Sequence, residues 1–413
     1  MNILYCTDAI PPYSTGGPGK RIWSICKEFA RRGHQITLVT TVPDKSKAGL
    51  TTESGVVVHA LYSKYHPAFR PYVSVYNPLV IRRIRKIIRD RKPDVIHADN
   101  IHQNVSYGIL GVARSFGIPA FITARDAMMV AYGKIYPKVH DCTGNDYRIT
   151  WHDRMRQAGK SFNPFREYAI RHYVRQANKV FTNSLFLKEI LHQNGIENTE
   201  VVHNGVEVAI HEFSPDVLEE KRNAFGFADK KIIFLPGRLN YAKGAYALVD
   251  ALTKVIKKQP RAVALFAGAT EEEKKNVLAY AREQGVVDFV RIFGWTDGKD
   301  LEAFYALSDV VTSPSLCVDF FPGVNLEAAS YKKPVLTTCF GGGKEFVQDG
   351  KTGYVINPYD TSEFADRISK LLEDSRGAQQ MGEAGFLRLR EHFSLSEQAE
   401  KLLRWYRKES HAL

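Results

Sequence analysis

Several features of common protein classes are missing from this sequence. No stretch approaches the roughly 18 uninterrupted apolar residues of a membrane span. The first apolar run, Asn2–Cys6, is too short for a signal peptide and has no basic residues before it. The cysteines are widely spaced and form no C-x-x-C pair, which argues against a zinc site or a disulfide framework. We therefore expect a cytoplasmic protein with no bound metal and with reduced, mostly buried thiols: Cys6, Cys26, Cys142, Cys317 and Cys339.

What is present is an ordinary globular composition with an uneven distribution of charge. The chain has 413 residues, of which 44% are hydrophobic and 25% charged, so it is long enough for two domains. Residues 1–205 contain 29 Lys and Arg against 15 Asp and Glu, whereas residues 206–413 contain 28 against 30. The basic first half suits phosphates, an anionic membrane surface or nucleic acid; a solvated surface that keeps the protein soluble is the alternative.

Short apolar runs alternate with segments of helical periodicity along nearly the whole chain. This alternation predicts parallel sheets with helices on both faces. The pattern breaks near residue 205 and restarts, which predicts two Rossmann-like α/β domains at 1–205 and 206–394. Residues 395–413 contain an amphipathic helix, Ser396–Lys408, that packs on its own domain or back on the first one. The expected strands are Asn2–Cys6, Gln35–Thr41, Asp94–His97, Ala120–Thr123, Lys179–Thr182, Glu200–Val202, Lys231–Leu235, Ala262–Ala267, Phe289–Phe293, Asp309–Thr312, Pro334–Thr337 and Tyr354–Ile356.

A glycine-rich loop follows the first expected strand and opens a helix. It runs from Ser14 to Arg21 and fits neither the P-loop nor the G-x-G-x-x-G pattern, because other residues stand at positions that those motifs fix. A loop at this place offers backbone N–H groups and the positive end of a helix to an anion. We favour the approach of a phosphate to Gly16 and Gly17; a tight turn that needs positive φ is the alternative.

A second loop, Pro236–Gly244, again lies between a strand and a helix. Arg238 offers a planar fork of donors and Lys243 a point charge, so together they can straddle a diphosphate and neutralise a leaving group. Two solvated surface cations are the alternative. The glycines and the repeated position after a strand favour the functional interpretation.

Two carboxylates accompany the segment Ser313–Ala329. Asp319 precedes a helix expected to start near Gly323, and Glu327 lies about one turn inside that helix. Carboxylates accept charge-assisted hydrogen bonds from sugar and ribose hydroxyls. A helix cap and a surface Glu are the alternative.

Seven short segments along the chain form an ordered set. They are Gly16-Gly17, His203-Asn-Gly-Val206, Gly237-Arg-Leu with Lys243-Gly244, Phe293-Gly-Trp295, Pro314-Ser with Asp319-Phe-Phe-Pro-Gly-Val-Asn-Leu-Glu327, Gly341-Gly-Gly-Lys-Glu345 and Asp349-Gly-Lys-Thr-Gly353. This set resembles glycosyltransferase family 4, the retaining nucleotide-sugar transferases of GT-B fold. The resemblance covers nearly the full length and is most specific in the second half. It implies two Rossmann-like parallel-sheet domains facing across a cleft, with the donor bound mostly by the second domain and the acceptor mostly by the first.

The resemblance also implies roles for single residues. Arg238 and Lys243 would hold the donor diphosphate, Glu327 the ribose hydroxyls, and Asp319 the transferred sugar. No metal or other cofactor is implied, because cationic side chains and helix N-termini stabilise the leaving nucleotide, with UDP or GDP expected. The remaining implied donor-binding residues contribute mainly their backbone: Gly16, Gly17, Gly237, Gly294, Phe321, Pro322, Gly323 and Val324.

Two positions depart from the family pattern. The paired-acid motif usually begins with Glu, where this chain has the shorter Asp319. A first-domain segment that often carries His reads Thr123-Ala-Arg-Asp126 here, with Arg125 in the place of the His. Arg125 and Asp126 are therefore candidate catalytic residues, although an Arg cannot shuttle a proton at neutral pH. The donor sugar and the detailed mechanism stay open.

Two further segments of the first half are candidates for other contacts. The basic helix Arg82–Lys92 carries Ile84, Ile87 and Ile88 on one side. It fits an anionic lipid surface or a packed helix with a solvated basic face. The irregular segment Tyr132–Arg166 is expected to form a binding loop or lid for the acceptor.

The resemblance thus implies an enzyme that moves a sugar from a nucleoside diphosphate-sugar to a hydroxyl of a saccharide or lipid-linked acceptor, with retention of configuration. Its product would be a glycan, a glycolipid or a cell-surface polysaccharide. The protein would be cytoplasmic, with peripheral contact at the inner face of the cell membrane. A nucleotide-sugar 2-epimerase and an inactive sugar-nucleotide binding protein are the alternatives. No nucleic-acid partner is expected, because the aromatic residues show no stacking-module pattern.

Overall fold

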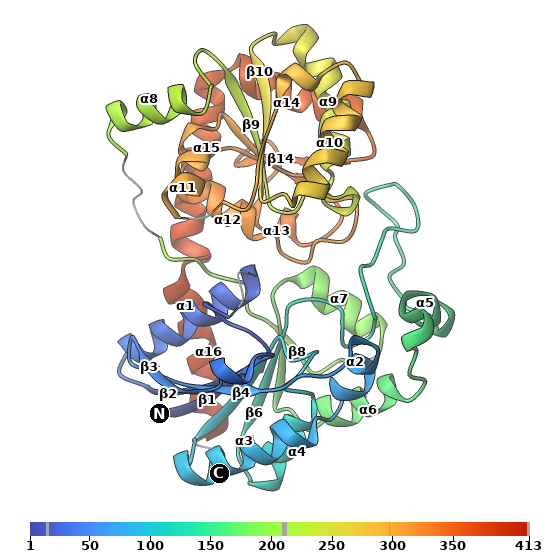
Figure 1. Cartoon of the computed structure of the whole chain (residues 1–413), viewed down its shortest axis with the longest axis vertical. Coiled ribbons are helices and arrows are strands. Elements are labelled where there is room, and N and C mark those ends of the chain that lie inside the picture. The colour runs from blue at the N-terminus through green and yellow to red at the C-terminus, as the bar shows by residue number, and fades with distance from the viewer. Residues whose placement is uncertain (14–15, 209–212, 297, 411–413) are drawn as a thin grey trace. The chain divides into compact units, whose positions relative to one another are not determined.

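The computed structural model describes residues 1–13, 16–208, 213–296 and 298–410 of the chain. The chain divides into two compact units, whose segments can be followed by colour in Figure 1. The observed division differs from the expected domains because residues 135–146 belong to the second unit. The C-terminal helix belongs to the first unit, which is one of the two placements expected for it. Unit 1 contains Met1–Lys134, Tyr147–Glu207 and Leu395–Leu413, and unit 2 contains Ile135–Asp146 and Val208–Ser394.

Unit 1 is built on a sheet of eight strands in the order β3-β4-β2-β1-β5-β6-β7-β8. All neighbouring strands pair in parallel except β3, which is antiparallel to β4. The chain moves outward from β1 in one direction through β2 and in the other through β5, so the carboxyl ends of β1 and β5 form a topological switch point, where such sheets bind ligands. The strands are β1 (Asn2–Thr7), β2 (Gln35–Val42), β3 (Gly49–Glu53), β4 (Val56–Tyr62), β5 (Val95–Asp99), β6 (Ala120–Ala124), β7 (Lys179–Thr182) and β8 (Thr199–Val201).

The structure contains a hairpin, β3–β4, that was not among the strands expected from the sequence. It turns through Ser54 and Gly55, which both have positive φ (51° and 77°), as two-residue hairpin loops require. Every residue of β3 is exposed, so this edge strand has no buried apolar face by which it could be recognised.

The helices of unit 1 follow from apolar spacing and capping residues. In α3, the Asn77 side chain accepts a hydrogen bond from the backbone N–H of Val80, while Ile81, Ile84 and Ile88 are buried on one face. The helices are α1 (Gly17–Arg31), α2 (Arg70–Val73), α3 (Pro78–Arg91), α4 (Gly108–Ser115), α5 (Trp151–Ala158), α6 (Arg166–Val174), α7 (Leu185–Gln193) and α16 (Leu395–Ser410), with 3-10 turns η1 (Lys45–Lys47), η2 (Pro67–Phe69) and η3 (Gly159–Ser161).

The last helix, α16, completes the core of unit 1. Figure 1 shows it in red beside the first helix, α1, and the sheet. The ring of Tyr406 lies 6.0 Å from that of Phe29 and 5.1 Å from that of Phe121, and its hydroxyl hydrogen-bonds to His97. Because Leu402, Leu403 and Tyr406 are all buried, unit 1 needs this distant segment of the chain to cover its sheet.

Unit 2 contains a sheet of six parallel strands in the order β11-β10-β9-β12-β13-β14. Its strands are short apolar runs; β10 reads AVALFA and is buried throughout, as expected for a parallel strand covered on both faces. The strands are β9 (Lys231–Pro236), β10 (Ala262–Ala267), β11 (Val290–Phe293), β12 (Val310–Ser313), β13 (Val335–Thr338) and β14 (Gly353–Ile356).

The helices of unit 2 connect these strands and cover the sheet. The capping box of Thr270 and Glu273 starts α10, and seven buried apolar residues of α9 pack into the core. The helices are α8 (Pro215–Ala224), α9 (Ala245–Lys258), α10 (Glu271–Glu283), α11 (Gly298–Leu307), α12 (Gly323–Ser330), α13 (Gly343–Phe346), α14 (Thr361–Glu373) and α15 (Ser375–His392), with 3-10 turns η4 (Tyr241–Lys243) and η5 (Val287–Phe289). Among the described helices of both units, none combines the length and the apolarity needed to cross a membrane.

Candidate active site

An ion pair between two loops marks the carboxyl edge of the sheet in unit 2. Lys243, in the loop between β9 and α9, donates from Nζ to Oδ2 of Asp319 at 2.6 Å. The Ser315 hydroxyl donates to the same carboxylate oxygen at 3.2 Å. The Lys243 and Asp319 side chains are 34% and 15% exposed, so the pair is held by the protein and still reachable from outside.

Backbone hydrogen bonds fix the Asp319 loop on both sides. The Leu316 N–H donates to the Ala242 carbonyl at 3.0 Å and so joins this loop to the one that carries Lys243. The Asp319 N–H donates to the Phe340 carbonyl at 3.0 Å, and the Gly342 N–H donates back to the Asp319 carbonyl at 2.9 Å. The carboxylate is therefore held between two neighbouring strand ends and is pre-positioned for binding.

The charges of these loops leave a positive excess. Burial works against the charge on Lys243, but the ion pair and hydrogen bond with Asp319 outweigh it and raise the pKa of the ammonium. Arg238 is exposed on the same loop, close enough for its charge to act on Lys243 in the opposite direction. Two cations against one carboxylate can hold a diphosphate and stabilise negative charge that develops on it.

At Gly244, the loop that carries Lys243 packs directly against the backbone of Pro314. The φ of Gly244 is +77°, and a Cβ at this position would lie 2.0 Å from the Pro314 carbonyl oxygen. We expect Gly244→Ala to lower the free energy of unfolding by about 2–3 kcal/mol, because the loop must shift as well as adopt a strained conformation. Guanidinium denaturation measures this loss.

Gly226 supplies the matched control for this prediction. It has a similar φ of +73°, but nothing lies within 4 Å of its added Cβ. Gly226→Ala should therefore cost only the left-handed conformation, about 1 kcal/mol. Equal losses for the two variants would show that the close approach at Gly244 has no energetic weight.

The segment that leads into α12 is buried or half-buried. Phe321 packs in the interior, where its ring stacks on that of Phe393 with centroids 5.9 Å apart. Pro322 precedes the helix, and Gly323 and Val324 form its first turn with backbone N–H groups that start the helix. The predicted donor contacts of these residues thus rest on their backbone, since the Phe321 ring is used in the core.

Glu327 lies in the second turn of α12 and accepts a hydrogen bond from the Tyr305 hydroxyl at 2.7 Å. This contact orients the Glu327 carboxylate. That the carboxylate binds the ribose hydroxyls of a donor stays a prediction. Sequence reasoning missed the groups that anchor α12. Asn325 is fully buried and hydrogen-bonds to Ser313 at 2.7 Å and to Thr337 at 3.1 Å.

Gly237 and Gly294 lie at the same edge of the sheet, after β9 and β11. Gly237 has a φ of +107°, and its backbone lies against that of Gly268, whose added Cβ would come within 2.9 Å of the Gly237 carbonyl oxygen. The Gly294 carbonyl accepts from the Gly268 N–H at 2.9 Å. The structure therefore gathers Arg238, Lys243 and Asp319 at this edge and supports it with glycine backbones.

The predicted site residues of the first half all lie in unit 1. Gly16 precedes α1 with φ −66°, and Gly17 is its first residue and is exposed. The tight-turn interpretation of this pair is wrong, because neither glycine has a positive φ. Nothing lies within 4 Å of a Cβ added at Gly17, which leaves room for a ligand to approach the start of α1.

Arg125 follows β6 and is almost entirely committed to protein partners. Its Nε and Nη2 donate to the two oxygens of Asp99 at 2.7 Å each, and its Nη1 donates to Asn204 at 2.7 Å. The side chain is 6% exposed. This arrangement favours a structural role, and the contribution of Arg125 to catalysis stays a prediction. Sequence reasoning missed Asp99, whereas Asn204 was part of the quoted segment His203–Val206.

Asp126, next to Arg125, is more accessible. One of its oxygens accepts from the Met128 N–H at 2.9 Å, and the other lies 3.9 Å from Nε2 of His102. His102 was not predicted as a site residue. It follows β5 at the switch point of the sheet, and that topology is what sequence spacing does not reveal.

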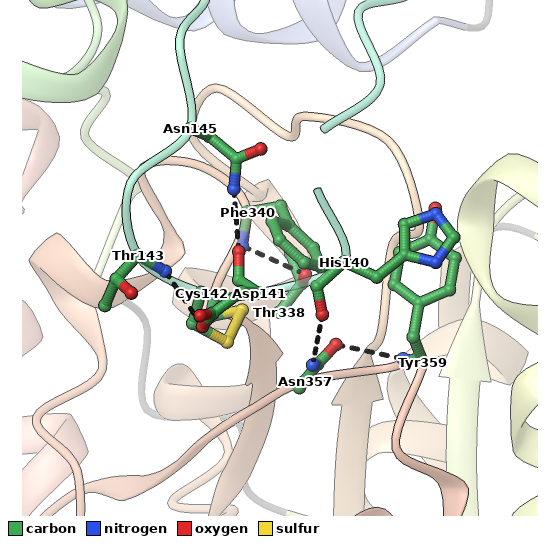
Figure 2. The surroundings of a disulfide bond; sticks show 10 residues. His140, Asp141, Cys142, Thr143, Asn145, Thr338, Phe340, Asn357 and Tyr359 are labelled. Carbon is green, nitrogen blue, oxygen red and sulfur yellow. Dashed lines mark hydrogen bonds between the residues drawn. A yellow bond between two sulfur atoms is a disulfide. The ribbon is translucent and has the colours of Figure 1, made fainter. Parts of the chain in front are cut away.

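A short segment of the first half, the strap (Ile135–Asp146), belongs to unit 2 (Figure 2). The Ile135 carbonyl accepts from the Val318 N–H at 2.8 Å, and the His140 carbonyl accepts from the Asn357 side chain at 2.9 Å. The His140 ring stacks on that of Tyr359, with centroids 3.7 Å apart. The strap therefore supports the loop that carries Asp319.

The strap also carries a disulfide bond, which corrects the expectation that all the cysteines are reduced. Cys142 is bonded to Cys339, and their Cα atoms lie 5.5 Å apart. The partners are 197 residues apart in sequence, so no spacing rule could pair them. The other three cysteines are buried thiols, as expected. The expected loop at Tyr132–Arg166 is likewise corrected, because it contains the strap, the helix α5 and the turn η3.

We expect the disulfide to stabilise unit 2 by about 2–4 kcal/mol, because it closes a very long loop of the unfolded chain. Dithiothreitol should lower the unfolding midpoint of the wild-type protein and leave that of Cys142→Ser unchanged. Under denaturing, non-reducing conditions the protein should show three titratable thiols of its five cysteines. Five titratable thiols, with no effect of the reductant, would contradict this prediction.

Each half of the chain matches a family of known proteins. The family described as Glycosyltransferase Family 4 matches residues 15–210, and the family described as Glycosyl transferases group 1 matches residues 217–388. The chain is 24% identical over 417 residues to glycogen synthase of Mycobacterium tuberculosis (strain CDC 1551 / Oshkosh), covering 95% of this chain and 91% of that protein.

Two further likenesses are more limited. The chain is 30% identical over 196 residues to spore coat protein SA of Bacillus subtilis (strain 168), a match that covers 46% of this chain and about half, 52%, of that relative's length. The crystal structure of Anabaena Alr3699/HepE in complex with UDP superposes with a TM-score of 0.72 at 19% identity, covering 99% of this chain and 100% of the other.

Two parallel-sheet units, each matched by a glycosyltransferase family, define a glycosyltransferase of GT-B fold. The expected fold class, two Rossmann-like parallel-sheet domains of GT-B type, is confirmed. The chain belongs to glycosyltransferase family 4.

Proposed function

We propose that the protein is a retaining glycosyltransferase that moves a sugar from a nucleoside diphosphate-sugar, with UDP or GDP as the leaving group, to an acceptor hydroxyl. The observation that carries the proposal is the Lys243–Asp319 pair beside the exposed Arg238 at the edge of the sheet in unit 2. The similarity to a protein whose structure contains UDP supports a nucleotide donor. A saccharide or a lipid-linked sugar is the proposed acceptor.

In the proposed reaction, Arg238 and Lys243 bind the diphosphate of the donor. As the bond between the anomeric carbon and the phosphate oxygen breaks, both cations stabilise the charge that develops on that oxygen. The acceptor hydroxyl oxygen bonds to the anomeric carbon from the same face, and its proton passes to the departing diphosphate oxygen. Asp319 holds the Lys243 ammonium in place and faces the sugar. The two side-chain cations supply the charge for which other enzymes use a metal ion.

A panel of UDP-, GDP- and ADP-sugars tests this proposal. A ligand that binds only the folded protein raises the free energy of unfolding, by about 2.7 kcal/mol at a hundredfold excess over Kd. The unfolding midpoint rises with it. One donor should stabilise the protein and, with an acceptor present, yield a coupled product of unchanged anomeric configuration. An epimerised sugar formed from donor alone would support the 2-epimerase alternative, and binding without turnover across acceptors the inactive binding protein.

We also propose that unit 1 contacts an anionic membrane surface. Arg82, Arg83 and Lys86 are exposed on α3. The segment before and into this helix, from η2 onward, exposes apolar and aromatic side chains, a combination that suits a lipid interface. Those side chains are Phe69, Tyr72, Tyr76 and Leu79.

Vesicle sedimentation tests the membrane contact. The protein should bind vesicles that contain anionic lipid and ignore neutral phosphatidylcholine vesicles. Replacing Arg82, Arg83 and Lys86 by Glu should weaken binding at least about 100-fold, since each basic residue contributes about 1 kcal/mol near such a surface. The same change at Lys254, Lys257 and Lys258 of α9 is the control. Equal binding to both vesicle types would contradict the proposal.

A further inference from the structure

A small cavity in unit 1 has no role in the reaction described above. Its volume is about 180 Å³, far above the roughly 10–15 Å³ that a single water needs. It lies between α2, the loop that follows β6, and the region of α5 and η3. Because the loop after β6 starts at the carboxyl end of a central strand, the cavity lies on the side of the sheet where such folds bind ligands. The lining residues used below are Arg70, Ser74, Tyr132 and Arg166.

Arg166 brings a buried positive charge to this cavity. The residue is 3% exposed. Its guanidinium donates to the carbonyls of Ala131 and Met128 and lies over the Tyr132 ring, 4.5 Å from the centroid. In the part of the chain that the structure describes, no carboxylate lies within ion-pair distance of it. A buried charge without a counter-ion is unfavourable unless a ligand neutralises it.

Arg70 adds a second cation to the same cavity. Its Nε donates to the His102 carbonyl at 3.3 Å, and its guanidinium too has no carboxylate within ion-pair distance among the described residues. Burial lowers the pKa of the Arg166 guanidinium, and the charge of Arg70 adds to this effect, whereas Tyr107, Tyr132 and Asp126 act in the opposite direction. The two guanidinium groups therefore repel each other across a cavity that holds no protein anion.

Ser74 supplies an unused donor. The residue is 1% exposed and lines the cavity, and its hydroxyl has no hydrogen-bond partner within the described residues. A buried hydroxyl without a partner is costly, and an oxygen atom of a ligand in the cavity would satisfy it. Two guanidinium groups without a carboxylate counter-ion among the described residues and a free hydroxyl donor together match the oxygens of a phosphate or carboxylate.

We propose that this cavity binds the anionic group, a phosphate or a carboxylate, of an acidic acceptor. The proposal rests on the proposed transfer of a sugar, because it names the class of acceptor that this transfer uses. The N–H groups of Arg166 that its hydrogen bonds to the Ala131 and Met128 carbonyls leave free receive the anion, and the Tyr132 ring helps to hold the guanidinium in place. Arg70 and Ser74 bind its remaining oxygens, and the neutral part of the acceptor extends out of the cavity.

Calorimetric titration without donor tests the proposal independently of catalysis. The probes are glucose, glucose 6-phosphate, glucuronic acid and inorganic phosphate. At least one acidic sugar should bind tenfold or more tightly than glucose and than inorganic phosphate. Arg70→Gln and Ser74→Ala should each weaken this binding at least tenfold, while Arg114→Gln, at an exposed position of α4, should leave it unchanged.

Three binding outcomes would overturn the proposal. Equal binding of glucose and the acidic sugars, or no binding, would show that the cavity does not select anions. Binding of inorganic phosphate as tight as that of the sugar phosphate would identify a site for the free ion. Acidic-sugar binding that survives Arg70→Gln and Ser74→Ala would place the site elsewhere. Donor-induced stabilisation of each variant confirms that it is folded, and failure of transfer with intact anion binding would refute the proposed function alone.

Discussion

Replacing Lys243 with alanine is expected to lower kcat/KM for sugar transfer about 10²–10³-fold, the usual cost of removing one group that stabilises transition-state charge. The side chain is held by Asp319 at 2.6 Å, and this pairing raises its pKa. The cation is therefore present throughout the neutral range and meets the diphosphate without rearrangement. Steady-state kinetics with the donor that stabilises the protein measure the loss.

Two variants separate a direct role of Lys243 from an indirect one. Lys258→Ala removes an exposed ammonium that pairs with Asp366 on the surface of unit 2, and it should retain full activity. Asp319→Asn should impair transfer but leave the affinity for the nucleoside diphosphate within about threefold, whereas Lys243→Ala should weaken that affinity about tenfold or more. If Lys243→Ala bound the nucleoside diphosphate with near-wild-type affinity, Lys243 would not be a ligand of the diphosphate.

Replacing Arg125 with glutamine is expected to lower the free energy of unfolding by about 3–5 kcal/mol, because it leaves a buried carboxylate without its cation. Asp99 is fully buried, and its only other side-chain partner among the described residues is the Tyr5 hydroxyl at 2.9 Å. The effect is larger than that of an exposed ion pair, since water cannot replace the lost guanidinium. Denaturant unfolding of the purified variant measures it.

A double variant tests the cause of this loss. Arg125→Leu combined with Asp99→Leu removes both charges, so it should be more stable than Arg125→Gln by at least about 1 kcal/mol. A loss below about 1 kcal/mol for Arg125→Gln would contradict the structural role. If kcat nevertheless fell strongly in Arg125→Gln, the result would support the catalytic role that the family pattern suggests for Arg125.

The alternation of strands and helices could be predicted because parallel strands buried on both faces leave continuous apolar runs in the sequence. The run Ala262–Ala267 and the strand Lys179–Thr182 have the predicted bounds. The edge strand β3 could not be predicted in this way, because it is exposed throughout and has no apolar run. The loop positions of Arg238, Lys243 and Asp319 were predictable for the same reason, since each follows the end of a buried strand.

What the sequence could not provide is the pairing of distant groups. The bond between Cys142 and Cys339, the contact of Arg125 with Asp99 and Asn204, and the cavity lined by Arg70, Ser74 and Arg166 all join segments that have no regular spacing. Such contacts depend on how loops close in three dimensions, and hydrophobic periodicity reports only which face of an element is buried.

The path of the chain has a consequence for how enzymes of this kind can be recombined. The polypeptide passes between the two units after Lys134, Asp146, Glu207 and Ser394. A single cut near residue 207 would separate α16 from the sheet it covers and Cys142 from Cys339. A chimaera that joins the first half of one such protein to the second half of another must therefore also exchange the strap and the last helix, and one joined at a single crossover should express poorly and aggregate through uncovered core.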